Sequence, residues 1–76
     1  MNAIRATVTR FDEEEGWGVL DAAEAPGGIF VHFSYIDMDG YKMLRKGQSV
    51  EIAPPGVLPY GHDGCRWFAR HVRPLD

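Results

Sequence analysis

Two short stretches constrain the fold of this chain most: residues 15–20, Glu-Gly-Trp-Gly-Val-Leu, and residues 29–33, Ile-Phe-Val-His-Phe. Successive side chains of an extended strand point to opposite faces, so residues two apart share a face. The first strand therefore presents Trp17 on one face, and the next strand presents Phe30 and His32 together. Flat aromatic rings in a row suit unpaired nucleobases, which stack on an aromatic side chain whatever their sequence.

The other face of the second stretch is apolar and can form a core. By the same alternation, Ile29, Val31 and Phe33 point to that face. Aromatic residues at strand spacing belong to a core more often than to a binding surface, but a barrel built from so short a chain cannot bury both faces. We therefore interpret Phe30 and His32 as residues of an exposed binding face.

Five stretches of strand-like sequence with irregular connections predict an all-β fold, a five-stranded antiparallel β-barrel. The expected strands are residues 4–11, 17–20, 29–33, 49–53 and 65–72, and a short helical turn is expected at 34–37. Residues 54–64 contain too many prolines and glycines for regular structure and are expected to form a loop. Closing the sheet into a barrel removes the exposed strand edges that promote aggregation.

The 76 residues leave room for one domain, which we expect to span residues 1–76. The composition, 45% hydrophobic and 25% charged, is typical of a globular protein. No apolar run approaches the roughly 20 residues that a membrane span needs. The N-terminus lacks the apolar core of a signal peptide, and the lone Cys65 fits a reducing compartment. We therefore expect a cytoplasmic protein, a monomer or a weak dimer, without membrane contact.

The charge is acidic and unevenly distributed. A net charge of −3 argues against binding driven mainly by phosphate neutralisation, for which a basic excess is usual. Residues 12–15, Asp-Glu-Glu-Glu, read most simply as a solvated turn, yet they adjoin the Trp17 strand and would repel phosphates there. Three arginines lie near the C-terminus, at positions 66, 70 and 73.

These motifs resemble those of the bacterial cold shock proteins. The first ribonucleoprotein motif of that family, usually Lys-Gly-Phe/Tyr-Gly-Phe-Ile, corresponds to residues 15–20, and the second, Val-Phe-Val-His-Phe, to residues 29–33. Further similarity lies at Ser34, residues 40–42, Leu44, residues 47–50 and residues 72–75. The resemblance implies that the barrel is the oligonucleotide/oligosaccharide-binding (OB) fold. It also implies an RNA chaperone or a regulator of transcription and translation.

The chain departs from the family pattern at three positions that bear on binding. Arg10 replaces the aromatic residue of the family's Lys-Trp-Phe on the first strand, Glu15 replaces the lysine of the first motif, and Val19 replaces its second aromatic residue. A guanidinium can lie flat on a base and contact phosphate. Each lost stacking partner removes about 1–3 kcal/mol of binding free energy, so we expect weaker binding than in a more basic relative.

The predicted interface with single-stranded RNA and single-stranded DNA comprises Arg10, Phe11, Trp17, Val19, Phe30, His32, Phe33, Tyr41 and Lys42. Four of these are expected to stack on successive bases: Trp17, Phe30, His32 and Tyr41. Arg10 and Lys42 are expected to contact phosphates. Phe11 and Phe33 are expected to border this row of stacking residues, and Phe33 is included because the resemblance gives it a binding role.

Two other functional classes stay open. The acidic run together with Val19 favours a protein-interaction module on the same barrel, with Trp17 and Phe30 as its anchors. An enzyme is the least favoured class, because no catalytic residues are recognisable: no nucleophile with a base, carboxylate pair or phosphate loop. His62, His71 and Cys65 lack a metal-ligand spacing, so we expect no metal, no cofactor and no small-molecule substrate.

Overall fold

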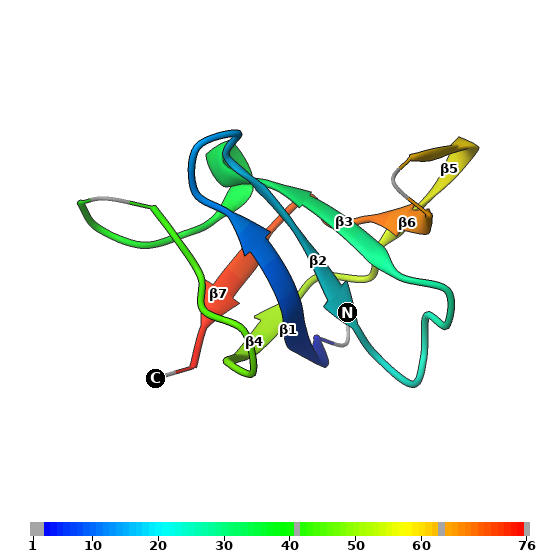
Figure 1. The fold of residues 1–76 in the computed structure, drawn as a ribbon. Helices are drawn as coiled ribbons and strands as arrows, with labels where there is room; N and C mark the ends of the chain where they lie inside the picture. The colour runs from blue at the N-terminus through cyan, green and yellow to red at the C-terminus, as the bar shows by residue number, and fades with distance from the viewer. Residues whose placement is uncertain (1–2, 41, 63, 76) are drawn as a thin grey trace.

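Hydrogen-bonded strands make up about half of the computed structural model, which describes residues 3–40, 42–62 and 64–75. The strands in these residues are β1 (Ile4–Asp12), β2 (Trp17–Asp21), β3 (Ile29–His32), β4 (Ser49–Ile52), β5 (Gly56–His62), β6 (Cys65–Phe68) and β7 (Val72–Pro74). A short 3-10 helix, η1 (Phe33–Tyr35), follows β3. The strands form one sheet in the order β5-β6-β3-β2-β1-β4-β7 (Figure 1). The predicted all-β class is confirmed.

The C-terminal third of the chain differs from the expected strand pattern. The prediction of a loop at residues 54–64 was wrong, since β5 forms there and pairs with β6 in antiparallel fashion. A strand with proline and glycine is tolerated in this place because β5 lies at the end of the sheet, where one side needs no ladder partner. The single strand expected at residues 65–72 is divided into β6 and β7.

This division carries the chain from one side of the sheet to the other. β6 pairs with β3 in parallel, and β7 pairs with β4 in antiparallel fashion. Between them the amide of Ala69 donates to the carbonyl of Phe30 (2.8 Å), and the amide of Asp37 donates to the carbonyl of Val72 (2.7 Å). The strand segments 65–68 and 72–74 thereby connect the β3 side of the sheet to the β4 side.

The core follows the alternation of the sequence. Along β1, Ala6 and Val8 are buried whereas Arg5 and Thr7 are exposed, and in β3 both Ile29 and Val31 are fully buried. The largest fully buried side chains are Leu20, Ile29, Ile36, Ile52, Val8, Val31, Val50, Val72 and Cys65. Burial of a Val, Leu or Ile side chain contributes about 1.5–3 kcal/mol. Within the described residues, no helix has the length and apolar character needed to cross a membrane.

A β-bulge in β1 changes which face the strand presents. The pairing of β1 with β2 shifts register between Val8 and Arg10, so Thr9 is an extra residue in the ladder. A bulge of this kind interrupts the alternation. Thr9 and Arg10 are consequently both exposed, and Phe11 turns toward the core. Without the bulge, Arg10 would share the face of Ala6 and Val8.

Gly18 is required by the close approach of β1 and β2. A Cβ atom at this position would lie 2.6 Å from Cδ1 of Phe11 and 2.8 Å from the carbonyl oxygen of Arg10. Contacts this short force the neighbouring atoms to move. The glycine of the first motif thus lets Phe11 cover the strand on its core side, while Trp17 and Val19 stand on the other side.

Candidate nucleic-acid interface

Four of the predicted residues meet on the outer face of β2 and β3. In the ladder between these strands Trp17 lies opposite His32, and Val19 lies opposite Phe30. All four side chains are half-buried. The rings of Trp17 and Phe30 are stacked diagonally, with centroids 5.8 Å apart and an interplanar angle of 26°. We call Trp17, Val19, Phe30 and His32 the platform.

Arg10 extends the platform from β1. Because the bulge turns it outward, its side chain meets Trp17, and its guanidinium carbon lies 4.7 Å from the centroid of the indole ring. This is a cation–π contact, worth about 0.5–1 kcal/mol at an exposed site. The guanidinium therefore occupies a position over Trp17 that a stacked base would also use.

His32 is held by the turn that follows it. The backbone amide of Ser34 donates to Nδ1 of His32 (3.3 Å), and the Ser34 hydroxyl lies 2.8 Å from the same nitrogen. Because Nδ1 accepts a hydrogen bond, the proton of the neutral imidazole lies on Nε2. The ring can then stack on a base or donate from Nε2 to it.

Phe33 does not lie on the core side, where strict alternation put it. β3 ends at His32, and Phe33 opens η1, so the alternation stops one residue earlier than expected. The side chain is 42% exposed, and its ring contacts that of His32 at a centroid distance of 4.7 Å and an angle of 40°. Its amide donates to the carbonyl of Gly16 (2.8 Å), which fixes η1 against the β1–β2 hairpin.

Two further predicted residues, Phe11 and Lys42, lie apart from the platform. Phe11 packs against the buried core on the opposite side of the sheet, because the bulge reverses its direction, so the expectation that it borders the platform is corrected. Lys42 lies beside Phe33 and the acidic residues of the hairpin. Tyr41 falls outside the residues that the structure describes.

The acidic run forms the tip of the β1–β2 hairpin next to Phe33. The amide of Glu15 donates to Oδ1 of Asp12 (2.9 Å), so Asp12 stabilises the turn. Residues 13–15 are exposed and border a hollow of about 450 Å³ that Phe33 and Lys42 also line. Three carboxylates thus surround one end of the binding face.

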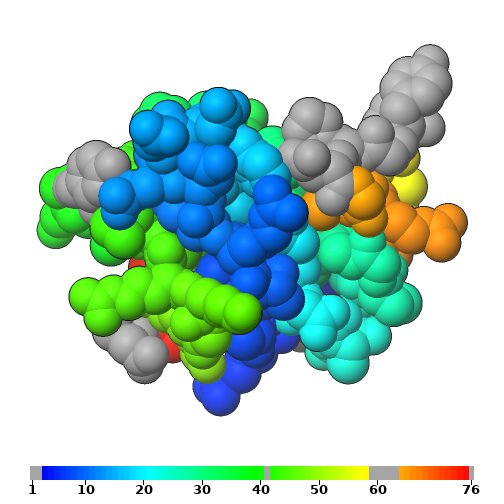
Figure 2. All heavy atoms as spheres, in the orientation of Figure 1, coloured from blue at the N-terminus to red at the C-terminus, as the bar shows by residue number. Residues whose placement is uncertain are grey.

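A second hollow lies at the other end and includes residues that the sequence did not point to. Its volume is about 290 Å³, and it is lined by Phe30, His32, Tyr35, Leu58, Phe68 and Ala69. Figure 2 shows β6, in orange, on the right of this view and the blue β1–β2 hairpin at the upper left. Tyr35 and Leu58 were missed because their proximity to β3 depends on η1 and on pairing distant in sequence.

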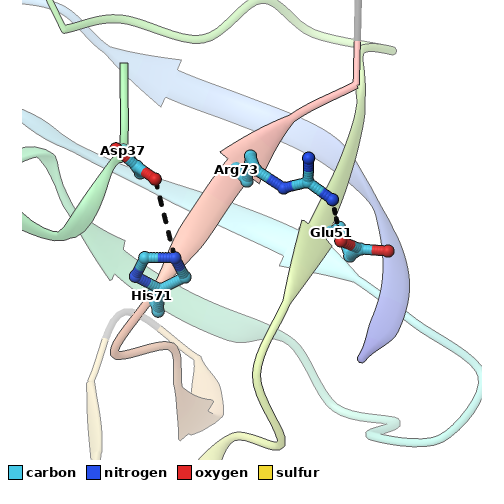
Figure 3. Close-up of polar contacts among 4 residues, drawn as sticks. All are labelled: Asp37, Glu51, His71 and Arg73. Carbon is cyan, nitrogen blue, oxygen red and sulfur yellow. Dashed lines mark hydrogen bonds and ion pairs between the residues drawn. The ribbon is translucent and has the colours of Figure 1, made fainter. Parts of the chain in front are cut away.

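The C-terminal arginines have different surroundings. Arg73 of β7 is hydrogen-bonded to Glu51 of β4, and this hydrogen bond, followed by the charge of Glu51, raises the pKa of Arg73 (Figure 3). Arg66 lies with its side chain over Gly27. Arg70 places its guanidinium carbon 5.4 Å from the centroid of Phe68, at the edge of the second hollow. Arg70 therefore lies on the ring of Phe68, which is the ladder partner of the platform residue Phe30.

A further polar contact joins the segment after η1 to the residue that precedes β7. Nε2 of His71 lies 3.8 Å from a carboxylate oxygen of Asp37, and both side chains are exposed (Figure 3). Trp67 also has a structural partner, since its indole nitrogen donates to the carbonyl of Pro26 (2.9 Å) and its ring packs against the core. These contacts stabilise the C-terminal strands, whereas the platform residues lie on β2 and β3.

Comparison with known proteins identifies the kind of domain to which this geometry corresponds. Residues 4–53 match the family model described as the "Cold-shock" DNA-binding domain. The chain is 49% identical over 48 residues to cold shock protein CspA of Staphylococcus haemolyticus (strain JCSC1435), which covers 63% of this chain and 71% of that protein. It is 41% identical over 50 residues to a cold shock-like protein of Aquifex aeolicus (strain VF5), covering 66% and 71% respectively. The matched segment contains β1–β4 and ends before β5.

Proposed function

The chain belongs to the cold-shock domain family, a family of nucleic-acid-binding domains, and on this basis we propose that it binds single-stranded RNA and single-stranded DNA by base stacking, with little sequence preference. The observation that carries the proposal is the stacked pair of Trp17 and Phe30 on the outer face of the sheet, with His32 beside it. Stacking on aromatic rings contributes about 1–3 kcal/mol per base and tolerates any sequence.

In this proposal the strand lies across β2 and β3. Trp17, Phe30 and His32 each take a base, and Val19 supplies an apolar contact where relatives have a further ring. A base on Trp17 displaces the guanidinium of Arg10, which then contacts the neighbouring phosphate. Phe33 borders the path of the strand, Lys42 contacts a phosphate, and Tyr41 is expected to stack on a further base.

Capture of unpaired bases accounts for a role as an RNA chaperone or as a regulator of transcription and translation. A protein that binds only open strands shifts the equilibrium between hairpin and open RNA by mass action. The mechanism involves no bond cleavage and no nucleotide hydrolysis, so the protein is not an enzyme in this proposal. We place it in the cytoplasm as a monomer or a weak dimer.

Protein interaction is the second candidate, and one observation favours it. Phe33 is 42% exposed and adjoins the three carboxylates of residues 13–15, which suits a basic peptide better than a phosphate backbone. A partner bound there would use Phe33 as its anchor.

Tryptophan fluorescence tests the proposed function directly. The Trp67→Phe variant leaves Trp17 as the single tryptophan, and titration with oligo-dT and oligo-U should quench its emission as bases stack on the indole. Duplex DNA of the same composition is the control and should quench far less. A folded variant whose Trp17 emission is unchanged by both oligonucleotides, but which binds a basic peptide, would favour the protein-interaction module.

A further inference from the structure

The platform continues beyond β3 onto strands that lie outside the segment matched to the family. Phe68 of β6 is the register partner of Phe30 in the parallel ladder between β3 and β6. Partners in a ladder point to the same face of a sheet. Phe68 therefore stands beside Phe30 on the face that carries Trp17, and the row of rings extends from β2 through β3 to β6.

The position of Phe68 is fixed by a glycine on the next strand. Gly56 of β5 lies opposite Phe68, and a Cβ atom there would come within 2.6 Å of Cε1 and Cζ of the phenyl ring. The ring thus lies over the bare backbone of Gly56. Leu58, two residues further along β5, completes the apolar border of the hollow of about 290 Å³.

Charge lies on the other side of Tyr35. This residue follows β3 in η1, is 48% exposed, and lines both the apolar hollow and a second one of about 320 Å³. This charged hollow is also lined by Lys42, Arg70 and His71, together with Asp37, whose carboxylate lies 3.8 Å from Nε2 of His71. A flat apolar surface next to two permanent cations is complementary to a nucleotide, which joins a flat base to an anionic phosphate.

We propose that the hollow formed by Phe30, His32, Tyr35, Leu58 and Phe68 holds one further unpaired base of the strand that occupies the platform. The phosphate next to that base contacts Arg70 and Lys42. The hollow lies just below the range of about 300–1,000 Å³ that small-molecule pockets occupy, so it suits a single base. This proposal rests on the proposed function, because the same strand must also cover Trp17 and Phe30.

The side chains that line the hollow determine whether it distinguishes one base from another. Apart from the imidazole of His32, the side chains around the hollow are hydrocarbon or aromatic, with one phenol at Tyr35. Such a lining offers little hydrogen bonding to the edges of a base, which is where sequence is read. The hollow therefore lengthens the binding site by one nucleotide without adding sequence preference.

The test places a fluorescent base at each position of the strand in turn. A set of oligo-dT strands, each with one 2-aminopurine, is titrated with the Trp67→Phe protein and with its Tyr35→Ala and Leu58→Ala derivatives. Val57→Ala is the matched control: Val57 neighbours Leu58 on β5, is 67% exposed and does not line the hollow. Phe68 is left intact because its ring packs on Gly56.

The expected result has three parts. One 2-aminopurine position loses its quenching in both Tyr35→Ala and Leu58→Ala, while the positions over Trp17 and Phe30 keep theirs. Affinity falls by roughly five- to tenfold in Tyr35→Ala, the lower range for loss of one base–aromatic stack. Val57→Ala behaves as the parent protein.

Two results would overturn the proposal and are distinguishable. If Trp17 is quenched as in the parent but both derivatives keep the same quenched positions and an affinity within twofold, the hollow holds no base and the proposed function stands. If Trp17 is not quenched in the parent protein, both proposals are wrong. Because Tyr35 and Leu58 lie on different elements, misfolding of one variant leaves the other as the test.

Discussion

The two ends of the binding face share the same sheet but differ in charge. At one end, the β1–β2 hairpin places the carboxylates of residues 13–15 around Phe33. At the other end, Phe68 and Tyr35 carry the aromatic surface toward Arg70. On the proposed function, an oligonucleotide should be repelled at the hairpin and attracted at the hollow. The net charge of −3 conceals this difference, and we expect the distribution of charge around the rings to determine where the strand lies.

Removal of Trp17 tests whether strand binding at both ends of the face depends on the platform. Of the substitutions considered, it should reduce single-strand affinity the most. Trp17→Ala deletes a ring that stacks on Phe30 and carries Arg10, so single-strand affinity should fall by about 1–3 kcal/mol. Fluorescence anisotropy with labelled oligo-dT measures the loss, and thermal unfolding monitored by circular dichroism shows that the fold is kept. Unchanged affinity in a folded variant would mean that the strand binds at the hollow end alone.

Reversal of one charge at the hairpin should reduce the difference in charge between the two ends of the binding face. Glu15→Lys removes a repulsion beside the platform and should tighten binding at low salt by about 0.5–1 kcal/mol, with the gain shrinking as salt rises. The matched control is Glu24→Lys, an equal change of net charge at an exposed residue between β2 and β3. Equal gains from the two variants would show that only net charge matters and that the hairpin has no local effect.

Sequence alone was sufficient for the part of the fold that depends on alternation. Ile29 and Val31 are fully buried, whereas Phe30 and His32 stand on the outer face with Trp17, as the period of two requires. The hydrophobic pattern sets which face of a strand is buried, so core and platform could be separated without a structure.

The remaining features depend on contacts that no local pattern reveals. The bulge at Thr9 reverses Phe11 and exposes Arg10, and the sequence marks this position only by two consecutive polar residues, Thr9 and Arg10, before Phe11. β5 forms because a neighbouring strand pairs with it, which overrides the prolines and glycines of its sequence. The hollow end arises from the parallel pairing of Phe30 with Phe68, two residues far apart in the chain.

The salt dependence of binding should come from three cations: Arg70 and Lys42, which line the charged hollow beside Tyr35, and Arg10, which lies on Trp17. Arg70, Lys42 and Arg10 are the cations next to the proposed path, and three phosphate contacts at about 0.7 each give a slope of log K against log salt near −2. Arg70→Gln should make the slope shallower by about 0.7. Arg66→Gln is the control, since the Arg66 side chain lies over Gly27.

A steep parent slope would contradict this assignment. A value beyond about −4 implies roughly six phosphate contacts on a single strand, more than the three cations provide. Equal losses in the Arg70 and Arg66 variants would mean that the whole C-terminal edge attracts the strand. Either result would move the centre of the attraction from the hollow to β6 and β7.

Substitution of Arg10 should have the smallest effect, because two contributions oppose each other. A base on Trp17 displaces the guanidinium and costs the cation–π contact of about 0.5–1 kcal/mol, while the freed cation gains a phosphate contact of similar size. Arg10→Gln should therefore change affinity by less than about twofold, well within the 1.4 kcal/mol that corresponds to tenfold.

In a Trp17→Ala background the cost of displacement is gone, so the same substitution should weaken binding more than it does in the parent. A double-mutant cycle measures this coupling. The opposite result, in which Arg10→Gln weakens binding more in the parent protein than in the Trp17→Ala protein, would contradict this prediction. It would mean that the guanidinium stays on the indole and binds the strand from there. The hairpin end of the binding face would then contribute more binding free energy than its negative charge suggests.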